Sequence, residues 1–318
     1  MVLTSELKDN SSAVNQFFRA YFNDEASKAF FKSLRAEQRR WDLVVESPSD
    51  LPGKSYGLVI GMAFDYVVRA TTWAFDYHQT AASACIPFYN ARLGFPLSVD
   101  DFEGHRYLFN GLTGEMRDYD EFRQDATDEK AARALWLMEL DREIYNTLGS
   151  ADILQSSIVW AWLEGLGRTG QWSAAMEEAF QNREPLYGLI KRIHPAAILD
   201  LTNLLESYQA HQRPHWHGHP VISNPKFGES AGDWVVDHTL WDMKTTKNPA
   251  KTAEHDIKQV LGYSLLDSAD QHAITNMGLY YPRFAKALEW SAEALLEELS
   301  GQSHPLNWWR TRWIEALH

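Results

Sequence analysis

Two short runs with the alternating pattern of β-strands, residues 234–236 and 239–245, are separated by only two residues, the Asp-His pair at 237–238. Asp and His are among the residue types that tolerate a positive φ, which a two-residue hairpin turn requires, although Asp-Gly is the stronger signal. Pairing the strands outward from this turn places Asp233 opposite Asp242. The sequence therefore predicts a β-hairpin with a fixed register.

Because side chains alternate along a strand, Asp233, Asp242 and Lys244 share one face of this hairpin. Opposed carboxylates hold their Cβ atoms about 4.5–5.5 Å apart and repel one another. A divalent cation would remove the repulsion, since Mg²⁺ binds one or two carboxylates together with phosphate and water oxygens. Lys244 could then hold a nucleophilic water or the phosphate. The alternative is a solvated polar face on which Lys244 is a partial counter-ion. We expect Trp234 and Trp241, on the other face, to belong to the core.

The residues around this hairpin resemble the PD-(D/E)XK nuclease superfamily. Asp233, followed after the turn by Asp242-Met-Lys244, is similar to the Asp…(Asp/Glu)-x-Lys signature of that superfamily. Gln259 and Tyr263, on the next predicted helix, are similar to the Gln-x-x-x-Tyr motif of its RecB-like branch. Both motifs stand in the order that the family has them.

Further matches continue this order. Residues 278–283, Gly-Leu-Tyr-Tyr-Pro-Arg, resemble the late strand and the arginine of the RecB-like branch. Residues 224–227, Asn-Pro-Lys-Phe, fit the strand that leads into the first Asp. The ordered set over residues 224–283 is a far more specific signal than the Asp-x-Lys motif alone.

The resemblance implies an α/β (α+β) fold, in which a mixed central β-sheet is flanked by helices as a restriction-endonuclease-like core, with a large helical N-terminal part or insertion. It divides the chain into five parts: an N-terminal helical arm (residues 1–55), a first core helix (56–75), a helical insertion (76–202), the nuclease core (203–290), and a C-terminal helix with a Trp/Arg-rich tail (291–318). The sequence pattern itself predicts helices at residues 12–41, 56–75, 195–208, 254–268 and 284–299, a mostly helical stretch at 97–189, and a further strand at 273–281.

By position, the resemblance implies that Asp233, Asp242 and the backbone carbonyl of Met243 bind one or two Mg²⁺ or Mn²⁺ ions. It assigns Lys244 as the catalytic lysine. Gln259 and Tyr263 are one helical turn apart, so they share a face that looks into the site. The alternative for these two residues is an exposed polar patch opposite the apolar stripe of their helix.

A further metal ligand is predicted from the helix at residues 56–75, which lies well before the hairpin in the sequence. RecB-like nucleases usually carry a Gly-x-x-x-His helix there, and residues 61–65 occupy that place with Asp65 where the family has His. This is a departure from the motif, although an oxygen ligand suits Mg²⁺ at least as well as imidazole does. The alternative is an ion pair between Asp65 and Arg69, one turn away. Glu206, on the helix predicted at residues 195–208, is the second candidate for this ligand.

Charge and cysteine content exclude several other classes of protein. Thirty basic and 43 acidic side chains give a net charge of −13, which argues against binding nucleic acid by charge alone but allows one local basic groove. A single cysteine excludes an internal disulfide, a four-thiolate iron–sulfur cluster and a Cys-rich zinc site. No apolar run reaches the roughly 18 residues of a membrane span, and the N-terminus lacks a signal-peptide pattern. We expect a soluble, cytoplasmic protein with no membrane partner.

Three functions stay open. The first is a metal-dependent nuclease acting on nucleic acid, in the first place DNA, as an exo- or endonuclease in repair, recombination or defence. The second is a serine hydrolase, since residues 228–232 match Gly-x-Ser-x-Gly with Ser230 as nucleophile, and Asp267 and His304 follow in triad order. This motif must lie between a strand and a helix. Here a predicted hairpin follows it, which argues against the hydrolase. The third is a non-catalytic nucleic-acid-binding module of nuclease fold. A protein partner or a homo-oligomer is compatible with each.

Overall fold

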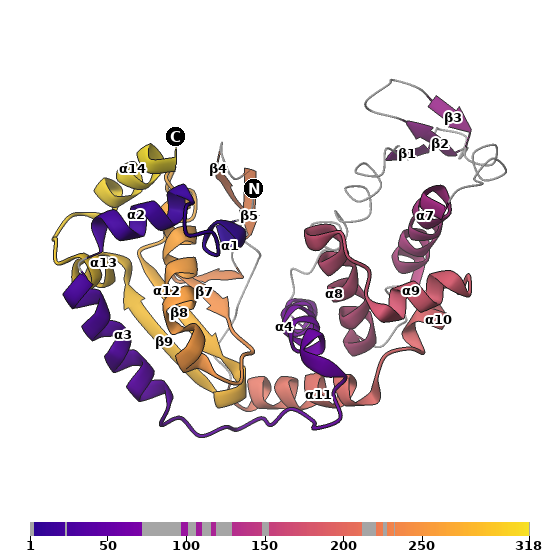
Figure 1. The fold of residues 1–318 in the computed structure, drawn as a ribbon, viewed down its shortest axis with the longest axis horizontal. Helices are drawn as coiled ribbons and strands as arrows, with labels where there is room; N and C mark the ends of the chain where they lie inside the picture. The colour runs from indigo at the N-terminus through magenta and orange to yellow at the C-terminus, as the bar shows by residue number, and fades with distance from the viewer. Residues whose placement is uncertain are drawn as a thin grey trace. The chain divides into compact units, whose positions relative to one another are not determined.

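The computed structural model describes residues 3–22, 24–71, 97–100, 106–109, 116–118, 129–147, 153–211, 221–224, 228–231 and 233–317. This part of the chain is mixed α/β and divides into two compact units (Figure 1). The first unit comprises Met1–Ser47, Thr71–Ala74 and Asn203–His318, and the second comprises Pro48–Ala70 and Phe75–Thr202. None of the helices in the described ranges is long and apolar enough to cross a membrane.

A four-stranded mixed sheet forms the centre of the first unit, with the strand order β6-β7-β8-β9. Its strands are β6 (Trp234–Val236), β7 (Thr239–Met243), β8 (Asn276–Tyr281) and β9 (Lys286–Ser291). The β6–β7 and β8–β9 pairs are antiparallel, whereas β8 runs parallel to β7. Parallel neighbours need a crossover connection, and helix α12 (Pro249–Leu266) provides it.

The predicted hairpin and its register are confirmed. Asp237 and His238 have φ values of 48° and 64°, so both turn residues adopt the left-handed conformation that a two-residue turn of this type requires. Trp234 pairs with Trp241, which sets Asp233 opposite Asp242 at the next position.

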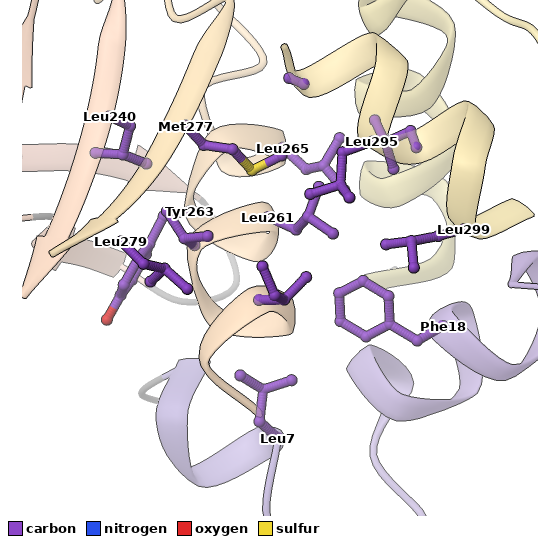
Figure 2. Packing of buried hydrophobic residues seen from close by; sticks show 14 of the residues in the cluster. Leu7, Phe18, Leu240, Leu261, Tyr263, Leu265, Met277, Leu279, Leu295 and Leu299 are labelled. Atoms are coloured by element: carbon purple, nitrogen blue, oxygen red, sulfur yellow. The ribbon is translucent and has the colours of Figure 1, made fainter. Parts of the chain in front are cut away.

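A hydrophobic cluster of the first unit lies between the sheet, α12 and the helices around α12 (Figure 2). Leu240, Met277 and Leu279 point from the strands toward Leu261 and Leu265 of the helix, and all five side chains are buried. Burying each such side chain stabilises the fold by about 1.5–3 kcal/mol. This cluster lies on the face of β7 that also carries Asp242.

The expectation that Trp234 and Trp241 mark the core face is therefore only half correct. Both tryptophans are buried, but so is Leu240 on the opposite face of the same strand. The physical reason is that β7 is an inner strand with β6 on one side and β8 on the other, and inner strands with a parallel neighbour are buried on both faces.

Five further helices belong to the first unit and pack against α12 or against each other. They are α1 (Leu3–Glu6), α2 (Ala13–Tyr21), α3 (Asp24–Gln38), α13 (Ala292–Ser300) and α14 (Leu306–Leu317). The single helix predicted at residues 12–41 is wrong, because the chain forms α2 and α3 there. In α14, Trp309, Arg310 and Trp313 are buried, with Arg310 Nη1 2.7 Å from Asp270 Oδ1, so these residues of the Trp/Arg-rich tail are used for packing.

The helix predicted at residues 284–299 is wrong in its first half. Residues 286–291 form the edge strand β9, and α13 begins only after Ser291, whose side chain accepts the backbone N–H of Ala294 as an N-cap. The pairing of β9 with β8 satisfies its backbone groups and overrides the helix propensity of this segment. Gly301 ends α13 in the left-handed conformation.

The second unit is mainly helical. Its helices are α4 (Gly53–Ala70), α7 (Glu129–Thr147), α8 (Ile153–Thr169), α9 (Ala174–Gln181) and α10 (Leu186–Ile190), and α11 (Pro195–Ala210) continues from this unit into the first. Of the helix predicted at 56–75, residues 72–75 lie outside the described part of the chain.

The prediction of a mostly helical stretch at 97–189 is wrong at its beginning. The antiparallel strands β1 (Leu97–Asp100), β2 (Arg106–Phe109) and β3 (Met116–Asp118) form a small sheet there. Residues 97–118 contain three glycines and no alanine, and glycine disfavours the interior of a helix. The Ala- and Leu-rich residues that follow dominate the composition of the longer segment, so this local signal against a helix did not change the prediction.

Gly278 on β8 lies against the ring of Trp241 on β7. A Cβ atom at position 278 would overlap the ring carbons Cε3 and Cζ3, and the buried ring has little room to move aside. We expect Gly278→Ala to lower the free energy of unfolding by about 1–3 kcal/mol, the usual cost of overpacking. Equilibrium denaturation in urea measures this change.

Gly57→Ala is the matched control for this substitution. A Cβ atom at position 57, on the exposed side of α4, meets nothing within 4 Å. Alanine is the better helix former by about 0.5–1 kcal/mol, so this change should be slightly stabilising. If Gly278→Ala is as stable as the wild type, the close packing of Trp241 on β8 is not a constraint on the fold.

Candidate active site

Asp242 lies near the C-terminal end of strand β7 of the hairpin, and Lys244 directly follows this strand. Asp242 lies on β7 and is only 4% exposed. The backbone N–H of Lys244 donates to the carbonyl of Tyr280 at 2.8 Å, which extends the pairing of β7 with β8 by one residue. The two side chains form an ion pair between Lys244 Nζ and Asp242 Oδ2. Of the alternative given above, the solvated face is therefore wrong for Asp242, whereas the ion pair is the counter-ion contact that it predicted for Lys244.

Asp233 lies at the start of the opposite strand of the hairpin. Its Oδ2 accepts the backbone N–H of Met243 at 2.6 Å, so its carboxylate reaches across to the segment between Asp242 and Lys244. Asp233 and Lys244 are both partly exposed. The site therefore has a buried end at Asp242 and a side that solvent reaches.

Helix α12 supplies the second side of the site. Lys244 Nζ donates to Gln259 Oε1 at 2.9 Å, and Gln259 Nε2 donates to the hydroxyl of Tyr263 at 3.4 Å. Both α12 side chains are buried, because this helix is covered on most of its circumference. The exposed-patch alternative for Gln259 and Tyr263 is therefore wrong.

The sequence reasoning missed a third carboxylate in this cluster, Asp256. Its Oδ2 accepts the hydroxyl of Thr252 at 2.8 Å and the hydroxyl of Tyr281 at 3.1 Å. Tyr281 in turn accepts a hydrogen bond from Gln38 Nε2 at 3.3 Å. A signal for Asp256 was present in the sequence, since it lies three residues before Gln259 and so shares its helix face.

Burial and charge act together on the ionisable groups. Burial raises the pKa of Asp242; Lys244 opposes this shift, and the negative charges of Asp233 and Asp256 add to it. Burial alone would lower the pKa of Lys244, but Asp242 and Asp256 raise it above its ordinary value. The carboxylates around Lys244 therefore favour its protonated ammonium form.

The predicted ligand Asp65 lies on α4 in the second unit. Its Oδ2 is 2.6 Å from Arg69 Nη2, which is the ion pair given above as the alternative. Glu206 is an exposed residue of α11. Throughout the described ranges, no three carboxylate, imidazole or thiolate side chains form a group that could hold a metal ion. A metal role for Asp65, for Glu206 or for the carbonyl of Met243 stays a prediction.

Asp233 and Asp242 nevertheless fit a hard divalent cation. Mg²⁺ binds one or two carboxylates and completes its shell with water and phosphate oxygens, and the donors here are oxygens only. Asp242 Oδ2 is buried and pairs with the Lys244 ammonium. The donor set therefore suits Mg²⁺ or Mn²⁺ better than a metal that prefers nitrogen or sulfur.

The serine-hydrolase alternative has the wrong local structure. Ser230 lies in strand β5 (Gly228–Ala231), which pairs with β4 (Val221–Asn224) as an antiparallel ladder, whereas a nucleophile elbow lies between a strand and a helix. The ring of His304 stacks on that of Trp308 at 3.9 Å between centroids. Asp267 Oδ1 accepts the backbone N–H of Gln271 at 2.8 Å. Residues 225–227 and Gly232 lie outside the described part of the chain.

Comparison of the chain with protein-family models, with curated proteins and with solved structures finds no match. The resemblance to PD-(D/E)XK nucleases therefore depends on the residues themselves and stays a hypothesis. What the structure adds is a set of contacts within the hairpin, within α12 and between the two. These contacts join five of the predicted site residues in one cluster: Asp233, Asp242, Lys244, Gln259 and Tyr263.

Proposed function

We propose that this chain is a metal-dependent nuclease that hydrolyses phosphodiester bonds of nucleic acid, with DNA as the first substrate to test. The observation that carries the proposal is the position of the Lys244 ammonium. It is held between Asp242 of the strand and Gln259 of the helix, and the carboxylate of Asp233 reaches the backbone N–H of Met243 between Asp242 and Lys244. A lysine ammonium beside carboxylates that can bind a divalent cation suits phosphodiester hydrolysis, because both positive charges can stabilise the negative charge that develops on the phosphate.

The order of elements supports a restriction-endonuclease-like core as the finer description of the fold. The β6–β7 hairpin carries the carboxylates and the lysine, α12 carries Gln259 and Tyr263, and β8 then returns parallel to β7. The resemblance implies this kind of mixed sheet flanked by helices. Arg283, at the end of the predicted motif, is buried, and its Nε donates to the carbonyl of Thr245 at 2.8 Å, so it fixes the segment that follows Lys244.

Each residue of the cluster has a separate task in this proposal. Asp233 and Asp242 would hold one or two Mg²⁺ or Mn²⁺ ions, which supply polarisation of the phosphate and acidification of a water molecule. Lys244, protonated and partly exposed, orients the water or a phosphate oxygen. Gln259 holds the ammonium group, and Tyr263 holds the amide of Gln259. In the hydrolysis, a water oxygen bonds to phosphorus, one P–O bond breaks, and the departing oxygen takes up a proton.

A cleavage assay on linear duplex DNA, circular DNA, single-stranded DNA and RNA tests this function. Mg²⁺ and Mn²⁺ are added separately, and EDTA is the control. Cleavage that EDTA abolishes is the expected result, and cutting of the circle would identify an endonuclease. If the protein binds nucleic acid but cuts none of the four substrates with either ion, the non-catalytic module replaces the nuclease.

The affinity for duplex DNA should depend only weakly on salt. With a net charge of −13, the protein can bind DNA only through a local group of cations, so few phosphates are neutralised. Each neutralised phosphate contributes about −0.9 to the slope of log affinity against log salt concentration. Titrations by fluorescence anisotropy at several salt concentrations measure this slope. A value as steep as roughly −8 would reveal a large basic surface and contradict the prediction.

A further inference from the structure

Two of the segments through which the chain passes between the units attach to the turn that joins β8 to β9. This turn is a short 3₁₀-helix, Pro282–Phe284, in the first unit. The first segment is the strap, residues 41–47, after which the chain leaves the first unit. The second segment is helix α11, which brings the chain back at Asn203. The contacts of both segments with the turn lie within the first unit.

The strap is held on the turn by its backbone. The N–H groups of Val44 and Val45 both donate to the carbonyl of Arg283, at 2.8 and 2.9 Å. A carbonyl oxygen has two lone pairs, so these two bonds use its full accepting capacity. The ring of Trp41 also packs against the turn, with its centroid 5.9 Å from that of Phe284. The position of the strap and the position of the turn therefore depend on each other.

Helix α11 attaches to the neighbouring carbonyl of the same turn. Ser207 Oγ donates to the carbonyl of Pro282 at 3.4 Å, and the ring of Tyr208 lies edge-on to that of Tyr280, with 6.0 Å between centroids. Ser207 and Tyr208 are buried. The helix is continuous over Pro195–Ala210, across the boundary between the units. A displacement of its first half would therefore move these two side chains as well.

The turn in turn holds the segment that carries Lys244. Arg283 is 2% exposed, and its Nε donates to the carbonyl of Thr245 at 2.8 Å. On the other side, the backbone N–H of Lys244 donates to the carbonyl of Tyr280 at 2.8 Å. Ala285, directly after the turn, has a φ of 49°. This left-handed conformation is unfavourable for alanine and persists only where the surroundings impose it, so the turn is held in one conformation.

We propose that this turn couples the strap and α11 to the proposed active site. A displacement of either segment moves the carbonyl groups of Pro282 and Arg283, and the side chain of Arg283 passes the movement to the segment that follows Lys244. Energetic coupling is carried by contiguous hydrogen bonds and packed rings, and both kinds of contact are present here. A force that the second unit exerts on either segment thereby changes the cleavage rate. This effect on rate rests on the proposed nuclease function, whereas the coupling can be measured without activity.

Amide hydrogen exchange of the full chain measures the coupling directly. Val44→Pro removes one of the two donors to Arg283 and should raise exchange in residues 243–248 about three- to ten-fold, the scale of one hydrogen bond. Leu43→Pro is the matched control, because the two side chains are 42% and 50% exposed and this variant keeps both donors. It should leave exchange in residues 243–248 unchanged. Unchanged exchange there in Val44→Pro, or an equal rise in α13, would overturn the proposal.

The coupling must also act in the reverse direction, since coupling free energies are reciprocal. Arg283→Lys keeps the positive charge but has no donor in the place of Nε, so exchange in the strap should rise by a similar factor. An unchanged strap would contradict the coupling. If Val44→Pro does not fold, Ser207→Ala takes its place on the side of α11. Its control is Thr202→Ala, because Thr202 Oγ1 donates to Ile198 within the helix.

The cleavage assay then separates the coupling from the nuclease function. Val44→Pro should lower kcat about three- to ten-fold with KM nearly unchanged, because it displaces the segment of Lys244 rather than removing a contact with the substrate. An unchanged kcat in a protein that cleaves would overturn the proposal. Coupled exchange without cleavage by the wild type would keep the coupling and reject the nuclease function.

Discussion

Lys244→Ala should lower the rate of phosphodiester cleavage by about 10²-fold or more, the usual effect of removing a positioned acid–base or electrostatic group. The ammonium is the positive charge between Asp242 and Gln259. No other side chain of this cluster can replace it, because its neighbours are carboxylates, an amide and hydroxyls. The substitution leaves both proposed metal ligands in place, so folding, stabilisation by Mn²⁺ and nucleic-acid binding should be retained. Single-turnover cleavage measures the rate, and thermal melting measures folding and the stabilisation by Mn²⁺.

Lys258→Ala is the matched control. Its side chain is 18% exposed against 16% for Lys244, and it also forms an ion pair, at 2.9 Å with Glu254. It lies next to Gln259 in the sequence but has its own partner on the helix. This variant should cleave at nearly the wild-type rate. If Lys244→Ala also cleaves at that rate, the hairpin is a structural feature and the nuclease assignment is wrong.

The hairpin could be predicted from the sequence because local chemistry determines it. Two residues that tolerate a positive φ lie between two alternating runs, and this fixes the turn and the register together. The same reasoning placed Asp242 and Lys244 on one face, but it did not predict that this face of β7 is also buried. Helix α11 was also predictable, since it begins at Pro195, and proline favours the first position of a helix.

Other elements depend on pairing that no local pattern reveals. Strand β9 has the composition of a helix, and its strand conformation comes from hydrogen bonds to β8. The small sheet formed by β1, β2 and β3 was missed because a long, Ala- and Leu-rich window outweighed its glycines. In both cases the competing conformations differ little in intrinsic propensity, so tertiary contacts decide between them.

In the site, the sequence predicted the residue types but not their partners. The motif spacing indicated Gln259 and Tyr263, but the sequence was also compatible with an exposed patch. The structure excludes this patch, because α12 is covered on most sides. Asp256 was missed because its one sequence signal, the helix face it shares with Gln259, is common among helical carboxylates. Its significance comes from Tyr281 and Gln38, which are distant in the sequence. Contacts of this kind require the fold.

Asp242→Asn should abolish cleavage and stabilisation by metal together. In the wild type, Mn²⁺ at about 100 times its dissociation constant should add roughly 2.7 kcal/mol to the free energy of unfolding, a rise of about 5–10 °C in melting temperature. Asparagine has the shape of aspartate but lacks the charge, so the cation would lose one of its two carboxylates. Lys244 keeps Gln259 and the nearby charge of Asp256, and the variant should therefore fold. Melting curves with Mn²⁺ and with EDTA, together with the cleavage assay, measure both losses.

The contrast between the two substitutions separates the roles of the charges in this cluster. Lys244→Ala should keep the response to Mn²⁺ and lose the rate, whereas Asp242→Asn should lose both. A general loss of structure would lower the melting temperature of a variant in EDTA as well, and so would be recognised. If Mn²⁺ raises the melting temperature of Asp242→Asn as much as that of the wild type, the cation binds elsewhere. In that case the repulsion between Asp233 and Asp242 is compensated by Lys244 alone, and the hairpin does not belong to a metal site.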